Sequence, residues 1–361
     1  MTTEATSLTS ALQALLEKSI ARAGGWLPFD RFMALALYAP GLGYYANGTR
    51  KFGKLPGSGS DFVTAPEMTP LFGQALAVQV ADALQATQTD EVWEFGAGTG
   101  ALAAQLLGAL GEQVRRYTIV DLSGSLRERQ QQALAAFGGK VQWAGELPGQ
   151  LRGVVVGNEV LDAMPVKLLA RVEGVWQERG VGPGMAWLDR PTDLRPPVDI
   201  PGEHDYLTEI HPQAEAFVRT LADRLAQGAA FFIDYGFGEG EYYHPQRHMG
   251  TLMCHKGHQA DTNPLADLGL KDITAHVNFS GLALAAQEAG LATLGYTTQA
   301  RFLINCGLID LLAAASVGER ANAQKLVNEH EMGELFKVIG LARGVDFDPV
   351  GFRAGDRSHT L

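Results

Sequence analysis

Cysteine and long apolar runs are both scarce in this chain of 361 residues. The two cysteines, Cys254 and Cys306, lie far apart and form no Cys-x-x-Cys pair. This excludes a disulfide framework and is typical of a reducing compartment. A membrane-spanning helix needs roughly 18 or more consecutive apolar residues. Since no segment comes close to that length, we expect no membrane span.

Positive charge is scarce too. Lys and Arg number 29 against 40 Asp and Glu, which gives a net charge of −11 with no dense basic cluster. Proteins that bind nucleic acid through its phosphates carry a basic face, so nucleic acid is not expected as a partner. The start, MTTEATSLTSALQALLEK, has neither a basic segment before an apolar one nor many arginines. We therefore expect no signal or transit peptide, and a cytoplasmic protein.

Short apolar segments alternate with helical ones through much of the chain. Strands are predicted at 91–96, 117–123, 140–145, 153–160 and 231–236. Helices are predicted at 7–23, 30–38 (with Asp30 as N-cap), 68–86, 99–110, 125–137, 213–227, 280–289 and 301–340. Continuous apolar strands separated by helices predict an α/β protein, with a mostly parallel sheet covered by helices on both faces.

The same pattern predicts four consecutive parts. An N-terminal helical part contains an irregular loop rich in Gly, Pro and Ser, and such loops are often functional. Two parts of the core follow, separated by an insertion with hairpin strands, and the second core part contains a loop-rich insertion and C-terminal helices. The boundaries are 1–88 (loop 40–66), 89–170, 171–228 and 229–361 (insertion 238–275).

Three glycines follow the first core strand in EVWEFGAGTG (residues 91–100): Gly96, Gly98 and Gly100. A glycine-rich turn lets a ligand approach the backbone, and the following helix adds N–H donors. GAGTGA matches the dinucleotide pattern G-x-G-x-x-G/A, which is weak on its own. Glu94 favours S-adenosylmethionine, whose sulfonium and amino groups are positive, over an anionic pyrophosphate. The alternative is a surface acid beside an ordinary tight turn.

Further acids follow the next two strands. Asp121 ends the second strand, where a carboxylate can bind both hydroxyls of an adenosine ribose in NAD or S-adenosylmethionine. Its alternative role is to cap the next helix, which Ser123 could also do. Glu146 follows the third strand and can meet an adenine amino group or simply be solvated. These residues predict an adenosyl nucleoside without choosing between the two ligands.

Polar side chains also follow the fourth strand, in GNEVLDAMPV (residues 157–166). Asn158, Glu159 and Asp162 leave the carboxyl edge of the sheet, where open α/β sheets bind ligands. Buried acids and amides are costly without partners, so this group suits a cationic or amine substrate. The alternative is a solvated loop in which Asp162 caps a helix.

With these motifs, the sequence resembles class I S-adenosylmethionine-dependent methyltransferases. More narrowly it resembles the MidA-like family, whose mitochondrial members are complex I assembly enzymes that methylate protein arginine. The matching segments are FMALALYAPGLGYY, SGSDFVTAPEMTPLFG, VWEFGAGTG, GNEVLDAMPV, FFIDYG, GTLMCHKGH, DITAHVNF and MGELFKVIGLARG, between residues 32 and 343. The resemblance implies a seven-stranded sheet with an antiparallel last hairpin, plus insertions over the site. The chain departs from it at Asn278, where we expect an acid in the family, and this puts the substrate specificity in question.

The resemblance also implies which residues contact the methyl donor, with Asn158 and Glu159 near the methyl group and SDFVTAPE (60–67) folded over the donor. The predicted donor-binding residues are Glu94, Gly96, Ala97, Gly98, Gly100, Asp121, Glu146, Thr64, Pro66 and Asn158. An arginine acceptor is always protonated, so acids must hold its guanidinium and accept a proton. Glu159 is the first candidate for this role and Asp162 the second, with Asn158 beside them.

Other residues allow two interpretations. His276, in the segment that also contains Asp272, is a base or, by preference, a packing residue. Aromatic side chains of the N-terminal loop pack on adenine, on a substrate arginine or in the core: Tyr44, Tyr45 and Phe62. A third group matches no compact zinc motif, so no metal is expected: His244, His248, Cys254, His255 and His258.

Three classes of function are consistent with these observations. The first is a methyltransferase that acts on a protein substrate, such as arginine in a subunit of respiratory complex I. The second is an NAD-dependent oxidoreductase, supported by GAGTGA and Asp121. The third is a non-catalytic assembly chaperone that keeps the fold. The apolar helices predicted at 301–340 are either core or the face of a homodimer.

Overall fold

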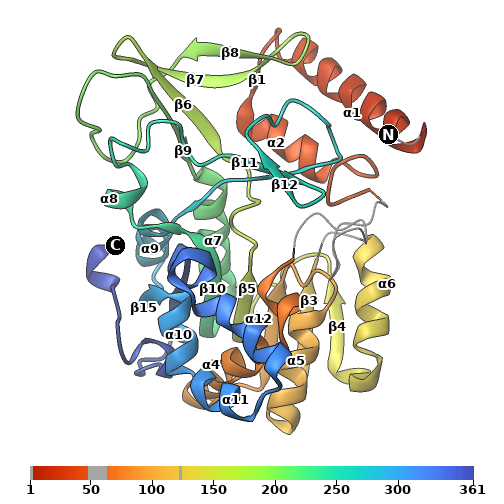
Figure 1. Cartoon of the computed structure of the whole chain (residues 1–361), viewed down its shortest axis with the longest axis vertical. Helices are drawn as coiled ribbons and strands as arrows, with labels where there is room; N and C mark the ends of the chain where they lie inside the picture. The colour runs from red at the N-terminus through yellow and green to blue at the C-terminus, as the bar shows by residue number, and fades with distance from the viewer. Residues whose placement is uncertain (1–2, 48–62, 122–123) are drawn as a thin grey trace. The chain divides into compact units, whose positions relative to one another are not determined.

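The computed structural model describes residues 3–47, 63–121 and 124–361 (Figure 1). The chain divides into two compact units, each built from three separate stretches. The first unit contains Met1–Phe62, Leu161–Ala214 and Phe237–Asn278, and the second contains Val63–Val160, Glu215–Gly236 and Phe279–Leu361. These units do not test the prediction that the chain has four consecutive parts, and it stays a prediction.

The second unit is built on a mostly parallel sheet (Figure 1). Its strands are β2 (Glu91–Phe95), β3 (Arg116–Val120), β4 (Val141–Ala144), β5 (Leu151–Asn158), β10 (Leu225–Phe237), β15 (Ala292–Thr298) and β16 (Phe336–Arg343). They follow the order β15-β16-β10-β5-β2-β3-β4. Neighbours from β10 to β4 are parallel, whereas β16 is antiparallel to both β10 and β15. The predicted α/β class and the antiparallel last hairpin are therefore present.

Helices cover both faces of this sheet. They are α3 (Ala65–Met68), α4 (Pro70–Thr87), α5 (Ala101–Leu110), α6 (Gly124–Ala133), α7 (Pro212–Arg224), α9 (Phe279–Glu288), α10 (Gln299–Asn305), α11 (Leu308–Ala314) and α12 (Val317–Val327). Helix α7 packs on one face, where the ring of Phe217 meets Phe95 at 5.0 Å and Phe232 at 5.6 Å between centroids. Helices α4 and α5 pack on the other face.

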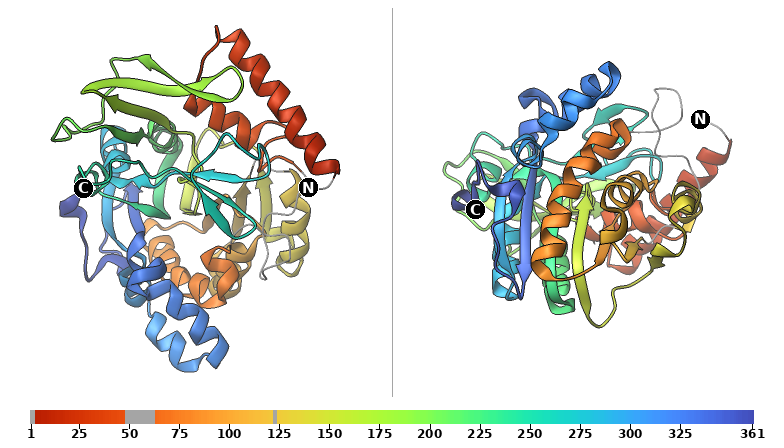
Figure 2. Two further views of the ribbon diagram at one scale, coloured as in Figure 1. Left: turned by 45° about the horizontal axis from the view of Figure 1, so that its top comes forward. Right: turned by 90° about the horizontal axis from the view of Figure 1, so that it is seen from below.

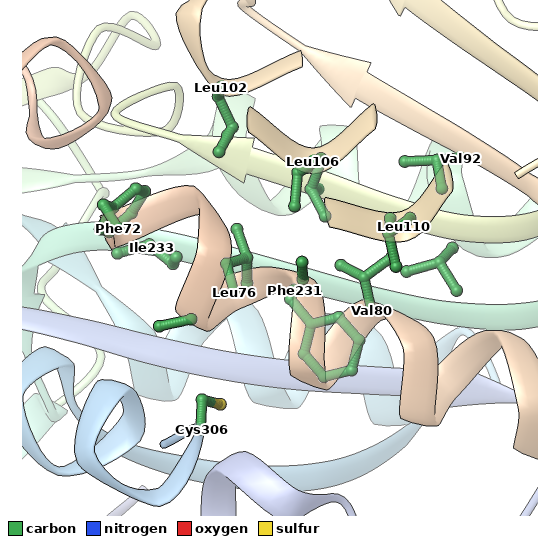
Figure 3. Packing of buried hydrophobic residues seen from close by; sticks show 14 of the residues in the cluster. Phe72, Leu76, Val80, Val92, Leu102, Leu106, Leu110, Phe231, Ile233 and Cys306 are labelled. Carbon is green, nitrogen blue, oxygen red and sulfur yellow. The ribbon is translucent and has the colours of Figure 1, made fainter. Parts of the chain in front are cut away.

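The main core of this unit lies between the sheet and helices α4 and α5 (Figure 3). Every fourth residue of α4, namely Phe72, Leu76 and Val80, points into it, because residues four apart share one face of a helix. From the sheet, Val92 and Phe231 complete the packing. Each such buried side chain contributes roughly 1.5–3 kcal/mol, which holds the carboxyl ends of the strands in a rigid frame.

The prediction of a helix over residues 301–340 is wrong for the last part of this range. The structure has three short helices, α10, α11 and α12, and then strand β16. All residues of β16 except its last are buried, and a short apolar run of this kind cannot be told from a buried helix by periodicity. Strand β15 was also missed. Helices α11 and α12 pack side by side (Figure 2), and Leu308 and Leu326 are core residues; the homodimer face stays a prediction.

The first unit contains helices α1 (Thr3–Arg22) and α2 (Phe29–Tyr38), which share a core with Leu12, Leu16 and Ile20 spaced four residues apart. Pro28 is the N-cap of α2, so the prediction of Asp30 as N-cap is wrong. Asp30 lies instead in the first turn, where its negative charge suits the helix dipole.

Two antiparallel sheets complete the first unit. The larger follows the order β1-β7-β6-β9, with β8 paired to β7: β1 (Leu27–Pro28), β6 (Lys167–Val172), β7 (Val175–Gly182), β8 (Ala186–Pro191) and β9 (Tyr206–Ile210). The predicted hairpin strands are thus confirmed. The segment 238–275 holds more structure than expected, namely α8 (Glu239–Tyr242) and the sheet β12-β11-β13: β11 (Met253–Lys256), β12 (Gln259–Asp261) and β13 (Asp272–Thr274). Strand β14 (Val277–Asn278) follows.

The structure also bears on the membrane and cysteine predictions. Within the described residues, no helix has both the length and the apolar character needed to cross a membrane. Cys254 and Cys306 are both free thiols in buried positions, and burial raises the pKa of each to about 12.

Candidate active site

The glycine loop connects β2 to α5 in a conformation that requires glycine. Gly96, Gly98 and Gly100 have φ angles of 64°, 53° and 87°, in the left-handed region that other residues rarely adopt. At Gly96 a Cβ atom would also lie 2.8 Å from Cγ2 of Val160. Ala97 is buried. The loop therefore needs a left-handed residue at every second position from Gly96 to Gly100. Gly100 is also the N-cap of α5.

Glu94 lies inside the protein at the carboxyl end of β2. Its side chain is 2% exposed, so the alternative of a surface acid is wrong. The hydroxyl of Tyr117 donates a hydrogen bond to Oε2 at 2.7 Å. Burial raises the pKa of Glu94 to about 8; the hydrogen bond opposes this rise, and the nearby Asp121 carboxylate adds to it. A carboxyl group with this pKa is mostly protonated at neutral pH.

Asp121 follows β3 and is joined to the glycine loop by a residue that sequence reasoning missed. The side-chain nitrogen of Gln130 donates to Oδ2 of Asp121 at 2.9 Å and to the carbonyl oxygen of Gly98 at 3.0 Å. Gln130 is completely buried on α6. In the sequence it is one of three consecutive glutamines, and nothing local distinguishes it from the others. Glu146, by contrast, is exposed.

Part of the segment expected over the donor lies against the glycine loop. Helix α3 begins after Thr64, its N-cap, and places Glu67 to accept a hydrogen bond from the hydroxyl of Thr99. The side chain of Gln105, on α5, donates to the carbonyl oxygen of Pro66 at 2.8 Å. Residues 60–62, including Phe62, lie outside the described residues. The described part thus joins α3 to the glycine loop at Thr99 and to α5 at Gln105, and donor contacts of Thr64 and Pro66 stay a prediction.

The end of β5 forms a strained turn. Glu159 has a φ angle of 53°, which is rare outside glycine and costs about 1 kcal/mol or more. Strand β10 holds this turn in place: Ile233 accepts from the backbone N–H of Glu159 at 2.9 Å, and the Asp234 carboxylate accepts from that of Val160 at 3.1 Å. Asp234 is completely buried, and its role was missed although an acid inside the apolar segment FFIDYG is a signal.

Asn158 presents an unsatisfied acceptor beside this turn. Its side-chain nitrogen donates to Oε1 of Glu159 at 3.1 Å. Its Oδ1 atom is buried and has no hydrogen-bond partner among the residues that the structure describes. Strand β5 pairs with β2, with Gly157 opposite Phe95, so Asn158 and Glu94 lie at the ends of neighbouring strands. A buried acceptor and a buried carboxyl group both require a donor or a cation, which phosphate does not provide.

Asp162 belongs to the first unit and is buried, with 6% of its surface exposed. A turn and then β6 follow it, so the alternatives of a solvated loop and of a helix cap are both wrong. Its carbonyl oxygen accepts from the backbone of Ala275 at 3.0 Å. The Tyr45 hydroxyl donates to Asp272 at 2.8 Å, and burial, together with the charges of Asp272 and Asp162, raises the pKa of Tyr45. This unit thus gathers two buried acids around a tyrosine.

The N-terminal aromatic residues pack mainly on each other. Tyr44 is 1% exposed and belongs to the core of the first unit. The Tyr45 ring meets Tyr44 edge to face at 5.0 Å and stacks on Tyr38 at 5.6 Å. Their core role therefore has direct structural support, and a contact with a ligand stays a prediction.

His276 is held by its backbone on both sides. Its N–H donates to Thr251 Oγ1 at 3.0 Å, and Nε2 of His211 donates to its carbonyl oxygen at 2.9 Å. Its ring stacks on Phe237 at 5.3 Å with an interplanar angle of 10°. These contacts favour the packing interpretation. The neighbouring Asn278 is buried.

The His and Cys side chains of the 244–258 segment do not assemble into a metal site. Across residues 3–47, 63–121 and 124–361, no group of three or more His, Cys, Asp or Glu residues is placed to hold a metal ion. Cys254 is buried in the apolar core of the first unit.

Comparison with known proteins identifies the class. Residues 75–297 match the model of a family described as "Putative S-adenosyl-L-methionine-dependent methyltransferase". This is more than half of the chain, and the chain belongs to this family of S-adenosylmethionine-dependent methyltransferases. The predicted enzyme class and methyl donor are confirmed, and the NAD-dependent oxidoreductase is set aside.

Individual relatives narrow the comparison. Protein arginine methyltransferase NDUFAF7, mitochondrial, from Danio rerio is 29% identical, with 92% of this chain and 88% of that protein covered. The Homo sapiens protein of the same name is 26% identical, with 92% and 83% covered. A Burkholderia thailandensis protein crystallised with S-adenosyl-homocysteine is 50% identical, with a TM-score of 0.96 over 100% of this chain and 99% of that one. The predicted MidA-like resemblance is confirmed.

These comparisons also correct one expectation. The chain was expected to be cytoplasmic, but the curated relatives are named as mitochondrial proteins. The cytoplasmic expectation is therefore withdrawn. It rested on the two distant cysteines, the lack of a long apolar run and the composition of the first residues.

Proposed function

We propose that this methyltransferase acts on arginine side chains of a protein substrate, such as a subunit of respiratory complex I or a similar protein. The names of the curated relatives support the arginine acceptor. The structural observation that carries the proposal is Glu159, a carboxylate on a strained turn at the carboxyl end of the sheet, with Asn158 hydrogen-bonded to it. Backbone strain of this kind is concentrated at functional sites.

The donor site is formed by the glycine loop and the strand ends around it. S-adenosylmethionine supplies an electrophilic methyl group on a sulfonium, and its product is bound in the Burkholderia thailandensis relative. In our proposal the bare backbone of Gly96, Ala97, Gly98 and Gly100 admits the donor, and Asp121 accepts from its ribose hydroxyls. Helix α3, with Thr64 and Pro66, covers the loop.

Glu94 and Asn158 select a cationic ligand in this proposal. The buried Oδ1 of Asn158 accepts from an N–H group of the donor and so gains the partner that it lacks among the described residues. Glu94 loses its proton when the positive donor approaches, because a neighbouring cation favours the ionised form. Glu146 is exposed and contributes at most a contact at the edge of the adenine.

Glu159 orients the acceptor and takes its proton. A carboxylate can hold a guanidinium through two parallel hydrogen bonds, and Asn158 keeps Oε1 of Glu159 in position. Positioning supplies most of the acceleration, because the methyl group is already reactive. Asp162 is the second acid proposed for the acceptor.

The test is methyl transfer from labelled S-adenosylmethionine into a lysate of a strain that lacks this protein, followed by hydrolysis and detection of methylarginine. Glu159→Gln should reduce transfer at least 100-fold, a typical loss for an acid–base residue, and should bind the donor normally. Glu173 is the matched control, since it has a similar φ angle of 50° and lies exposed in the β6–β7 turn. Wild-type rates for Glu159→Gln, or a label on an amino acid other than arginine, would refute the proposal.

A further inference from the structure

We propose that Gln130 is a positioning residue of the donor site. Its amide locks the carboxylate of Asp121 to the glycine loop and so determines how well the enzyme recognises the ribose of an adenosyl ligand. This inference rests on the proposed role of Asp121 as the ribose acceptor. Gln130 acts through Asp121 and the loop and is not proposed to touch the donor.

The burial of Gln130 is specific to this one residue. Helix α6 contains three consecutive glutamines, of which Gln131 and Gln132 are exposed and Gln130 is completely buried. A buried primary amide without hydrogen-bond partners is unfavourable. Gln130 is therefore stable in this buried position only because its polar atoms form hydrogen bonds.

Every polar group of the Gln130 amide has a partner. Nε2 donates one hydrogen bond to Asp121 Oδ2 at 2.9 Å and one to the carbonyl oxygen of Gly98 at 3.0 Å. Oε1 accepts from the indole N–H of Trp143 at 2.8 Å. A primary amide has two N–H donors and one carbonyl, so both donors are in use and the oxygen is paired.

The partners also fix which way the amide points. The indole of Trp143 can only donate, whereas the Gly98 carbonyl and the Asp121 carboxylate both accept. A flipped amide would place its N–H groups against the N–H of Trp143 and its oxygen against two acceptors. The orientation is thus determined by the network itself, and Trp143 is the residue that enforces it.

The position of Gln130 explains why the orientation of its amide affects the binding of a ligand. Gly98 follows β2, Asp121 follows β3 and Trp143 lies in β4, and these three strands are neighbours in the sheet. One side chain therefore connects three adjacent strand ends at the predicted donor site. Its backbone also lies beside the loop, since its Cα is 3.5 Å from where a Cβ of Gly100 would be. Loss of the amide would remove one hydrogen bond from Asp121 and one from the loop at the same time.

The test uses isothermal titration with S-adenosyl-homocysteine and with its 2′-deoxy and 3′-deoxy analogues. Gln130→Met keeps the size of the side chain and removes its hydrogen bonds. We expect S-adenosyl-homocysteine to bind about tenfold more weakly, the effect of losing one or two hydrogen bonds. Because the deoxy analogues already lack a ribose contact, they should lose less, and the preference of the enzyme for the intact ribose should shrink.

Gln130→Glu should have a larger effect, since it places a carboxylate against Asp121 and the Gly98 carbonyl. Trp143→Phe leaves Gln130 in place but removes the group that orients it, so its effect should be intermediate. The matched controls are Gln131→Met and Gln132→Met, which change exposed residues of the same helix and should leave all affinities unchanged.

Thermal unfolding of each variant separates positioning from folding. A purely structural role predicts a lower melting temperature with equal losses for all three ligands, and that result would overturn the inference, as would wild-type affinities in Gln130→Met. If Gln130→Met does not fold, Trp143→Phe applies the same criterion. If the wild-type protein bound no S-adenosyl-homocysteine, the proposed donor site would be refuted. This result can be distinguished from a failure of the inference about Gln130.

Discussion

Glu94 in the second unit and Glu209 in the first are both buried glutamates, 2% and 0% exposed, but their surroundings differ. Burial raises the pKa of each. Among the described residues, the Glu94 carboxyl group accepts one hydrogen bond, from Tyr117. Glu209 accepts four, from the hydroxyl of Tyr242, the hydroxyl and the backbone N–H of Thr251, and the backbone N–H of Leu252.

In the function proposed above, this difference separates a structural acid from one that binds a ligand. Glu209 anchors the segment after Gly250 to β9, where a Cβ at Gly250 would lie 2.5 Å from its Oε1, and its own chain satisfies it. Glu94 is left with unused capacity next to the glycine loop. Because a buried charge needs partners to be stable, we expect this carboxyl group to lose its proton only when a cation lies beside it.

The largest expected effect tests Glu94 directly. Glu94→Gln preserves the size of the side chain but cannot become negative, so we expect affinity for S-adenosylmethionine to fall about 100-fold, as for loss of a charge-assisted hydrogen bond of roughly 3 kcal/mol. Isothermal titration measures this. Glu128→Gln, on the exposed side of α6, is the control. Unchanged donor affinity in Glu94→Gln would remove the distinction drawn between the two glutamates.

Glu209→Gln should show the opposite pattern. Its amide nitrogen would face donors that now have no acceptor, so the free energy of unfolding should drop by about 2 kcal/mol. Donor affinity, measured below the unfolding transition, should stay the same. Urea unfolding followed by tryptophan fluorescence reports the first quantity and titration the second. A variant that kept full stability but lost the donor would place Glu209 in the binding site instead.

The pH dependence of donor binding gives a sharper test of Glu94. A raised pKa of about 8 means that Glu94 is mostly protonated at pH 7, so binding a cation must first remove this proton. Affinity for S-adenosylmethionine should therefore rise about eightfold from pH 7 to pH 8.5, and Glu94→Gln should abolish this rise. Proton release on binding, measured by titration in buffers of different ionisation enthalpy, should be close to one at pH 7.

The same group affects stability with the opposite sign. The folded, ligand-free protein holds a proton that the unfolded chain releases above its ordinary pKa of 4.5. The contribution of Glu94 to stability is therefore fully present below pH 4.5 and is lost as pH rises through about 8, by at most about 1.4 kcal/mol per pH unit. The difference in unfolding free energy between wild type and Glu94→Gln, measured from pH 5 to pH 9, should follow this course. A flat difference would contradict it.

The smallest expected effect is a difference of about 1 kcal/mol between a glycine of the second unit and one of the first. Gly96→Ala meets both a φ of 64° and the side chain of Val160, whereas Gly174 in the β6–β7 turn has a φ of 78° and open space around its Cβ position. We expect Gly174→Ala to lower the free energy of unfolding by about 1 kcal/mol and Gly96→Ala by about 2 kcal/mol. Only Gly96→Ala should weaken donor binding. Equal effects on both quantities would show that the close approach at Gly96 is unimportant.

Features that depend on local backbone preferences could be predicted from the order of the amino acids. The strand–loop–helix over 91–110 is visible because left-handed positions demand glycine and because a buried strand is a continuous apolar run. The α/β class and most helices follow from the same kind of pattern. So do the candidate acids at the strand ends, since parallel strands place their carboxyl ends at one edge.

Features that depend on partners far along the chain became visible only in the folded protein. Whether FKVIGLAR is a helix or strand β16 depends on its neighbours β10 and β15, which pair with it along its two edges. Whether Gln130, rather than Gln131, is buried depends on Trp143 and Asp121. The pKa of Glu94 depends on what covers it. Burial and hydrogen bonding depend on which residues surround a side chain in the folded protein. Two residues of the same type look alike in the sequence, and only packing gives them different surroundings.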